Sequence, residues 1–219
     1  MKAVCLISGG MDSYVAAAIA REEGYLLYGL TFNYGQKNRR ELTSARKVAA
    51  SLKMKKHWIV PVCLPVTGSS LTDPRRAVPR KRTASVPTTY VPARNTIFIS
   101  HGLAYAEVIG AEAVFVGVNA IDYSGYPDCR PEYLRQFQRL IDLALKKTVK
   151  GDRLFLKAPL LFLSKAEIVK KGLALGLDFS LTWSCYLSGR LPCGSCPSCR
   201  LRARAFQQAG VRDPSGRGK

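Results

Sequence analysis

Short apolar runs alternate with longer segments of helical spacing along most of this 219-residue chain. Five runs have the length and composition of buried strands: residues 3–7, 25–32, 57–60, 113–118 and 154–156. Five alanine-rich or amphipathic segments predict helices: residues 14–22, 41–52, 95–109, 131–146 and 164–175. Strands that alternate with helices indicate βαβ units, and therefore a doubly wound, mostly parallel α/β sheet with helices on both faces.

Capping signals suggest where three of these helices begin. Asn95 is a preferred N-cap residue, so we expect it to cap the third helix. Pro131 suits a first turn, because the N–H that it lacks would have no partner inside the helix. Ser164, followed three positions later by Glu167, predicts a capping box.

Ligands of doubly wound sheets bind beyond the carboxyl ends of the strands, which indicates in advance where the functional loops lie. Here these loops follow Ile7, Phe32, Val60 and Val118. The third loop, residues 61–93, is long and rich in Pro, Thr, Ser and Arg. Loops of that length are usually functional or disordered. We expect an active-site flap, with a mobile insertion as the alternative.

Residues 8–13 read Ser-Gly-Gly-Met-Asp-Ser and lie between a predicted strand and a predicted helix. The two glycines let successive N–H groups point at one anion, and the helix N-terminus adds partial positive charge. Ser8 and Ser13 can donate to phosphate oxygens, whereas Asp12 can hold an accompanying Mg²⁺. No Gly-Lys-Ser/Thr follows, so this phosphate loop is not of the Walker A type.

Four of the seven cysteines fall within fifteen residues and have the spacing C-x7-C-x2-C-x2-C: Cys185, Cys193, Cys196 and Cys199. Four thiolates match a closed, tetrahedral structural zinc site. A [4Fe–4S] cluster is the competing interpretation, since C-x2-C-x2-C also occurs in ferredoxins. Cys5, Cys63 and Cys129 are expected to be structural.

The segment 122–130 follows the fourth strand and should therefore reach the ligand crevice. It offers two aromatic rings that could stack on a flat heterocycle, and two carboxylates that could accept paired N–H donors, as on a guanine-like edge. A polar turn with a Tyr-Pro kink would account for the same residues equally well.

Hydrophobic residues make up 47% of the chain, which is typical of a globular protein. No apolar run reaches the length of about 18 residues that crosses a bilayer, and no secretion pattern is present, so we expect a soluble, cytoplasmic protein without a membrane partner. The net charge of +19 is large, with a dense basic patch at residues 75–82. Such a surface attracts phosphates or nucleic acid, although it is also typical of a solvated face.

The phosphate loop resembles that of the N-type ATP pyrophosphatases (PP-loop ATPases, with an adenine nucleotide alpha hydrolase-like fold). More specifically, Ser-Gly-Tyr-Pro-Asp-Cys-Arg at residues 124–130 resembles the signature of 7-cyano-7-deazaguanine synthases, enzymes of queuosine precursor synthesis. The similarity covers nearly the whole chain. It includes residues 31–36, 91–95, 110–113, 158–160, 165–167 and 182–185.

Residues 210–219 are polar and rich in Gly and Arg, so we expect a flexible tail there. The resemblance implies two parts before it: a PP-loop domain over residues 1–180, and a zinc knuckle with a following helix over 181–209. It implies ATP-dependent conversion of 7-carboxy-7-deazaguanine and ammonia to the 7-cyano product through carboxylate activation, amide formation and dehydration. It also implies one structural zinc ion per chain, held by the four clustered cysteines, ATP with Mg²⁺ as substrate, and a homodimer.

Site residues are carried over from the resemblance to this chain position by position. The expected ATP-binding residues are Ile7, Ser8, Gly9, Gly10, Met11, Asp12 and Ser13. Asp12, Arg94 and Lys165 are the expected catalytic groups, the last two as cations that neutralise phosphate. Tyr34, Tyr126 and Asp128 are expected to bind the deazaguanine.

Three positions depart from the family pattern: Asn33 stands where Asp is usual, Asn38 where His is usual, and Ala93 where Gly is frequent. The first two changes put a metal or ribose contact and a proton-transfer group in doubt. Two other interpretations stay open, the first favoured by the basic surface and the second allowed by the changes at Asn33 and Asn38. One is a tRNA-modifying adenylase or thiolase with a metal or iron–sulfur site, for which RNA is a possible but not expected partner. The other is a nucleotide-binding regulatory protein without catalysis.

Overall fold

The computed structural model describes residues 1–64, 68–80, 86–121, 125–187 and 189–216. Its five strands form one sheet in the order β3-β2-β1-β4-β5, and every neighbouring pair is parallel. The strands are β1 (Lys2–Leu6), β2 (Leu26–Asn33), β3 (Lys56–Pro61), β4 (Ala113–Phe115) and β5 (Phe155–Lys157). The predicted doubly wound α/β fold is confirmed.

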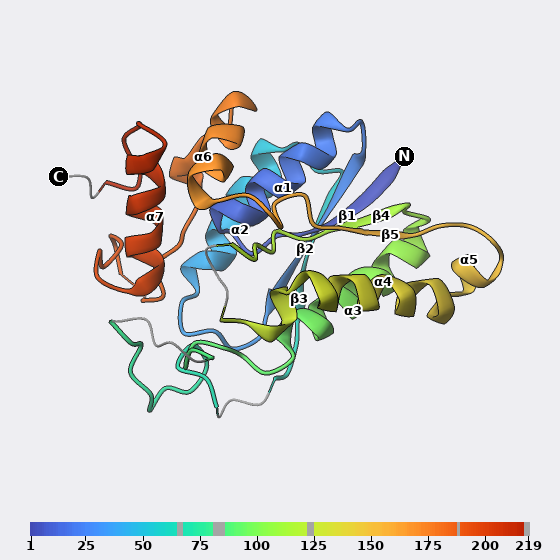
Figure 1. Ribbon diagram of the computed structural model, residues 1–219, viewed down its shortest axis with the longest axis horizontal. Coiled ribbons are helices and arrows are strands. Elements are labelled where there is room, and N and C mark those ends of the chain that lie inside the picture. Colours follow the sequence, from blue (N-terminus) through green and yellow to red (C-terminus); the bar gives the residue numbers. More distant parts are fainter. Residues whose placement is uncertain (65–67, 81–85, 122–124, 188, 217–219) are drawn as a thin grey trace.

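Helices cover both faces of the sheet (Figure 1). One face is covered by α1 (Met11–Glu22), α2 (Arg40–Ser51), α6 (Lys165–Ala174) and α7 (Pro197–Gln208). The other face is covered by α3 (Arg94–Ile109) and α4 (Pro131–Ala144), and the short α5 (Lys146–Val149) follows α4. Two 3-10 turns, η1 (Pro127–Cys129) and η2 (Phe179–Leu181), complete the described helical elements.

Side chains of the central strands alternate between the two cores, as the period of a β-strand requires. Ala3 and Cys5 of β1 pack under α1, whereas Val4 between them packs under α3. All three are essentially inaccessible to solvent. Because both faces are buried, the strands are continuous apolar runs rather than alternating ones.

The predicted helix starts are right in two of the three cases. Ser164 caps α6 and forms the capping box with Glu167, and Pro131 opens α4. Asn95 was wrongly predicted to be an N-cap. Ala93 occupies that position with a left-handed backbone (φ 53°), and no side chain of its own caps the helix. The backbone N–H of Asn95 instead bonds to Asp128, a residue far away in sequence.

Strand β4 is shorter than predicted, since it ends at Phe115 rather than at residue 118. The Val116 N–H still bonds to the carbonyl of Lys157, but Gly117 then passes against the start of α1. The chain leaves the sheet there in order to meet the phosphate loop.

The described part of the long segment 61–93 packs as a loop without helix or strand after β3. Leu64, Leu71 and Val91 form a small apolar cluster of their own, and Ser69 and Asp73 are buried. The segment is therefore attached to the body of the molecule both before and after residues 81–85. Residues 81–85, which include two members of the basic patch, lie outside the described residues.

Asp213 is anchored within the tail that we expected to be flexible. Its carboxylate pairs with Arg202 of α7 at 2.9 Å, and both side chains are buried. Among the described residues, no helix combines the length and the apolar character needed to span a membrane.

Candidate active site

A cavity of about 290 Å³ lies beyond the carboxyl ends of β1, β2 and β4, where the topology predicts a ligand site. Strand ends contribute Ile7, Phe32 and Val116 to its lining. Side chains from four separate segments also reach it: the start of α2, the start of α3, the segment around η1, and the residues that follow Thr182. Residues 122–124 of the predicted substrate segment lie outside the described residues.

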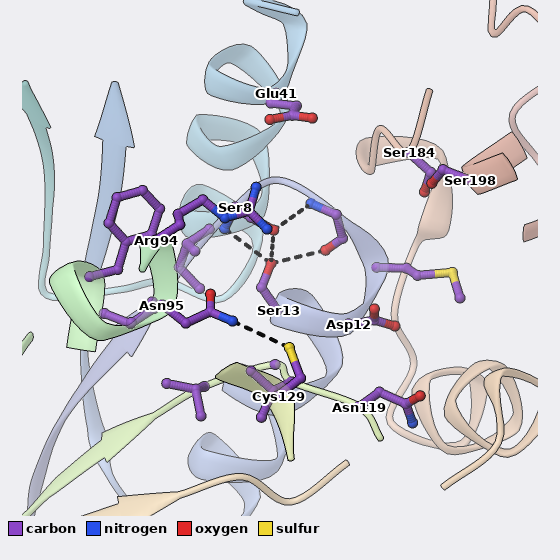
Figure 2. Close-up of a pocket in the computed structure, with 18 of the residues that line it drawn as sticks. Ser8, Asp12, Ser13, Glu41, Arg94, Asn95, Asn119, Cys129, Ser184 and Ser198 are labelled. Carbon is purple, nitrogen blue, oxygen red and sulfur yellow. Dashed lines mark hydrogen bonds between the residues drawn. The ribbon is translucent and has the colours of Figure 1, made fainter. Parts of the chain in front are cut away.

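The phosphate loop closes on itself around Ser13 (Figure 2). The Ser13 hydroxyl donates to the carbonyl of Gly10 at 3.0 Å and accepts from the backbone N–H of Ser8 at 3.2 Å. The Ser8 hydroxyl lies 3.1 Å from the Ser13 hydroxyl and accepts from the N–H of Gly10. These bonds hold the turn in shape at the N-terminus of α1, where the positive end of the helix dipole faces the cavity.

Glycine is required at two positions around this loop. Gly9 has φ 84°, and a Cβ there would lie 2.3 Å from the backbone oxygen of Glu41. Gly117, which sequence reasoning missed, lies behind the loop, where a Cβ would come within 2.6 Å of the Ser13 nitrogen. Both clashes are with backbone atoms, which cannot rotate away. The one signal that could have pointed to Gly117 is its place inside the predicted strand 113–118, where a glycine often marks a close approach of another backbone.

Asp12 and Lys165 form an ion pair across the floor of the cavity. Lys165 is almost fully buried at the start of α6, whereas the Asp12 side chain is 29% exposed. The other Asp12 oxygen, Oδ1, is buried and has no hydrogen-bond partner within the described part of the chain. A buried carboxylate oxygen without a partner costs folding free energy unless a cation binds to it. Asp12 Oδ1 is therefore a suitable ligand for a divalent ion.

Arg94 and Tyr34 meet on the opposite side of the cavity. Arg94 Nη1 donates to the Tyr34 hydroxyl at 3.2 Å, and the guanidinium lies over the Tyr34 ring. Burial works to lower the pKa of Arg94, but the neighbouring Tyr34, Tyr126 and Glu41 groups outweigh it and raise the pKa above its usual value. The guanidinium therefore stays charged in a partly enclosed site.

Glu41 also lines the cavity, and sequence reasoning did not select it. It lies in the first turn of α2, eight residues after the end of β2. Burial raises the pKa of its carboxyl to about 7, although nearby Arg94 lowers it. The rule that ligands gather at strand ends had indicated this loop, but the loop contains several polar residues and the rule does not distinguish among them.

Tyr126 and Asp128, both predicted to bind substrate, have different surroundings. Tyr126 lines the cavity, and its hydroxyl lies 2.8 Å from the Thr89 hydroxyl. Asp128 is buried and is not among the described residues of the lining. Its carboxylate accepts from the N–H of Asn95 at 3.0 Å, while the Asn95 amide donates to the Asp128 carbonyl. Asp128 thus holds the first turn of α3, which carries Arg94.

Cys129 lies at the cavity wall, and the Asn95 amide donates to its sulfur at 3.3 Å. Burial, assisted by the charge of Asp128, raises the pKa of this thiol to about 12. At neutral pH the group is a protonated thiol rather than a nucleophilic thiolate. This agrees with the structural role expected from the sequence.

The four clustered cysteines lie beside the cavity at the start of α7, with all four sulfurs within 4.8 Å of one another. Backbone N–H groups point at them: those of Leu187 and Cys193 donate to the sulfur of Cys185 at 3.3 Å. Such donors stabilise thiolates, so this donor set suits a metal ion.

Asn38 and Asn33, two departures from the family pattern, also have different surroundings. Asn38 is buried; its amide donates to the carbonyl of Cys185 at 2.5 Å and accepts from the N–H of Arg40. It therefore joins the start of α2 to the cysteine cluster. Asn33 is exposed at the end of β2.

Solved structures with a related fold include NMN synthetase from Francisella tularensis and a 4-thiouridine synthetase in complex with RNA and bound ATP. The first is 16% identical with a TM-score of 0.51, and the match covers 96% of this chain and 78% of that one. The second is 22% identical with a TM-score of 0.51, and this chain spans 95% of its own length but half of that protein. At this identity they support the predicted PP-loop fold and nothing about substrate.

Curated relatives are much closer. Two proteins named 7-cyano-7-deazaguanine synthase, from Pseudomonas syringae pv. syringae (strain B728a) and Frankia casuarinae (strain DSM 45818 / CECT 9043 / HFP020203 / CcI3), are 51% and 53% identical to this chain. The alignments cover 98% of this chain, and 95% and 93% of the relatives. A family model described as queuosine biosynthesis protein QueC matches residues 2–210. The chain belongs to the QueC family of queuosine biosynthesis proteins.

Proposed function

We propose that this protein is a 7-cyano-7-deazaguanine synthase, which converts 7-carboxy-7-deazaguanine and ammonia to the nitrile at the expense of ATP. The relatives of that name support the reaction. The observation that carries the proposal is that one cavity is lined by the phosphate loop, by the cations Arg94 and Lys165 and by the Tyr126 side chain, and is thus equipped for a nucleotide and an acidic aromatic substrate together.

The residues at the end of β1 would hold the triphosphate of ATP. In this proposal the N–H groups of Gly9, Gly10 and Met11 face the β- and γ-phosphates, and the Ser8 and Ser13 hydroxyls turn from each other to the phosphate oxygens. Asp12 Oδ1 would bind the Mg²⁺ that arrives with ATP. Ile7 would contact the nucleotide from the strand end.

The reaction requires two activations. A carboxylate oxygen of the substrate attacks the α-phosphorus of ATP, and pyrophosphate leaves, its charge neutralised by Lys165 and Arg94. Ammonia then attacks the acyl carbon, AMP leaves, and one proton is lost to give the amide. The amide oxygen then attacks the α-phosphorus of a second ATP, and a second pyrophosphate leaves. Loss of AMP and of the two amide protons forms the C–N triple bond.

The deazaguanine ring would lie against the aromatic side chains of the cavity. Tyr126 and Tyr34 offer the flat surfaces, and the Arg94 guanidinium beside Tyr34 favours an anionic carboxylate near it. For Asp128 we propose an indirect role in substrate binding, because its carboxylate positions α3 and thereby Arg94.

We further propose that the cysteine cluster holds one zinc ion as a structural staple. A tetrahedral site with Zn–S bonds of about 2.3 Å separates its sulfurs by about 3.8 Å, and the sulfurs of Cys193 and Cys199 lie 3.9 Å apart. A four-iron cluster inserts an iron–sulfur cube between its thiolates, and therefore needs wider spacing. A cytoplasmic homodimer, as the family resemblance implies, is part of the same proposal.

The metal content of the protein and the loss of one cysteine ligand test this assignment. We expect colourless protein with one zinc per chain by elemental analysis, and a melting temperature at least about 10 °C lower for Cys199→Ser, because folding and metal binding are coupled. Cys63→Ser, a change at an exposed cysteine outside the cluster, should retain both metal and stability. Brown protein containing iron would contradict the zinc assignment.

The reaction itself is tested by incubating the protein with ATP, Mg²⁺, ammonium and 7-carboxy-7-deazaguanine, and following the heterocycle by mass. We expect the mass of the nitrile, with none formed when ATP or ammonium is left out or when Lys165→Ala replaces the wild type. Unchanged substrate, together with proven ATP binding, would overturn the proposal. RNA would then be the acceptor to try, with the salt dependence of binding as the readout.

A further inference from the structure

The cavity has a carboxylate that no step described above uses. Among the described lining residues, Asp12 and Glu41 are the two that carry one. Asp12 pairs with Lys165 and has its free oxygen at the phosphate loop. Glu41 forms neither a hydrogen bond nor an ion pair within 4 Å with any residue of the described ranges, although Arg94 and Tyr34 are close enough to act on it electrostatically.

The position of Glu41 is closely constrained. Its backbone oxygen lies against Gly9, at the point where the Cβ of any other residue would be 2.3 Å away. The next turn of α2 is also close, since the same Cβ would lie 2.9 Å from the Ala45 nitrogen. The backbone of Glu41 is thus held against the phosphate loop, and its carboxylate lies beside the loop and apart from Asp12 (Figure 2).

Its chemistry suits a particular kind of partner. An ionised carboxylate has two acceptor oxygens and best matches a pair of parallel donors. Arg94 supplies no such pair here, because it donates to Tyr34 instead. A guanine-like ring has the required pair: the ring N–H and the adjacent exocyclic amino group. Of the two carboxylates in the segment 122–130, Asp128 is engaged at the start of α3, and Asp122 lies outside the described residues.

We propose that Glu41 is the specificity-determining residue of the site, and that it accepts both the ring N–H and the exocyclic 2-amino group of the 7-deazaguanine substrate. This inference rests on the proposed function and names the contact that selects the heterocycle. Burial raises the pKa of Glu41 to about 7, because the protein around it solvates the ionised carboxylate poorly. Donors from the substrate would stabilise the ionised form and make up that loss.

A substrate analogue that lacks the 2-amino group, 7-carboxy-7-deazahypoxanthine, tests the contact. We expect the wild type to use it with a kcat/KM on the order of 100-fold below that of the full substrate, because one oxygen of a partly buried charge loses its donor. In Glu41→Gln the discrimination should fall below about 10-fold, while the KM for ATP stays within about 2-fold. Glu132→Gln, a matched change at an exposed position of α4, should discriminate like the wild type.

The outcomes separate the two proposals. If the wild type converts 7-carboxy-7-deazaguanine and Glu41→Gln still discriminates about 100-fold, this inference is overturned and the proposed function stands. If Glu41→Gln instead raises the KM for ATP by the same factor as that for the heterocycle, Glu41 serves the nucleotide and the inference is again overturned. If the wild type gives no nitrile at all, both fall. Thermal unfolding of each variant confirms that it is folded before kinetics are read.

Discussion

Gly117 shows how a missing side chain can shape a binding site at the scale of one residue. The backbone after β4 passes so close to the phosphate loop that a Cβ at this position would lie 2.6 Å from the nitrogen and 2.8 Å from the Cα of Ser13. Both neighbours are main-chain atoms, so relief requires the loop itself to move. An alanine would therefore act on the nucleotide site without touching any ligand.

We expect Gly117→Ala to weaken ATP binding by about 10-fold or more, since overpacking of this kind costs about 1–3 kcal/mol. Calorimetric titration with a non-hydrolysable ATP analogue and Mg²⁺ measures the effect. Gly110→Ala is the control: Gly110 ends α3 with φ 65° and open space around it, so the change strains the backbone but leaves the cavity alone. Equal ATP affinities for Gly117→Ala and the wild type would show that the loop accommodates the extra methyl group.

Glu41 should destabilise the folded protein above neutral pH. Its pKa is raised from 4.5 to about 7, so between these values the folded state binds more protons than the unfolded state. Stability must therefore fall as the pH rises through that window, and it stays lower above pH 7. A shift of this size corresponds to at most roughly 3 kcal/mol, and partial exposure reduces it.

Glu41→Gln removes the ionisation, so we expect it to stabilise the protein at pH 8 by about 1–2 kcal/mol. At pH 4.5 we expect no comparable effect, because the wild-type carboxyl is protonated in the folded state and still about half protonated in the unfolded state. Urea unfolding at the two pH values measures the difference. A variant that is equally stable relative to the wild type at both pH values would show that Glu41 titrates normally. A gain in stability from removing a cavity carboxylate would fit a group retained for binding.

Helix α3 illustrates, at the scale of an element, why a local rule failed. The N-cap preference of Asn95 was read from residue type alone, yet the acceptor for its N–H is Asp128, 33 positions away. A left-handed Ala93 places the chain so that the acceptor comes from η1 rather than from the chain just before the helix. Asn95 keeps a polar role, because its amide bonds back to the Asp128 carbonyl and the Cys129 sulfur.

We expect Asp128→Ala to lower the free energy of unfolding by about 1–2 kcal/mol, as loss of a helix cap does. It should also lower kcat/KM about 10-fold or more, because the first turn of α3 carries Arg94. Asp128→Asn keeps an acceptor oxygen and should recover most of the stability. Chemical denaturation followed by fluorescence, with steady-state kinetics on the same samples, gives both quantities. An Asp128→Asn variant as unstable as Asp128→Ala would contradict the capping role.

The elements that could be predicted are those with local signals. Strand and helix periodicity, the glycine loop at residues 8–13, the capping box at Ser164 and the cysteine spacing each lie within a short window, so sequence sufficed. Glu41 and Gly117 could not be selected, because their significance comes from packing against residues far away in the chain. The end of β4 was placed too late for the same reason.

At the scale of the whole molecule, contacts between residues far apart in the sequence join the cysteine cluster to α2 and to the phosphate loop. Asn38 at the start of α2 bonds to the Cys185 carbonyl, and the N–H of Trp183 bonds to the carbonyl of Gly9 at 2.9 Å. The Arg40 guanidinium lies 4.8 Å from the centre of the Trp183 ring. The segment that carries the four cysteines is thus attached directly to the phosphate loop, so loss of the proposed metal ion should also disturb the nucleotide site.

Arg202 extends this coupling to the C-terminal segment. It is buried in α7, where it donates to the Phe179 carbonyl and the Thr182 hydroxyl and pairs with Asp213 through two nitrogens. A buried guanidinium without its counter-ion is expensive, whereas a surface pair contributes little. Residues after α7 are therefore part of the folded body at least as far as Asp213, although their composition alone suggested a flexible tail.

Asp213→Ala should lower the free energy of unfolding by about 3–5 kcal/mol, the usual cost of leaving one member of a buried pair. Truncation after Gly210 should have a similar effect, because it removes the same carboxylate. Asp152→Ala, a change at an exposed position, is the control and should alter stability by less than about 0.5 kcal/mol. Urea unfolding of the metal-loaded proteins measures all three. A small effect of Asp213→Ala would mean that water or another carboxylate compensates the charge of Arg202. In that case the double variant Arg202→Met with Asp213→Ala would be no more stable than Asp213→Ala alone.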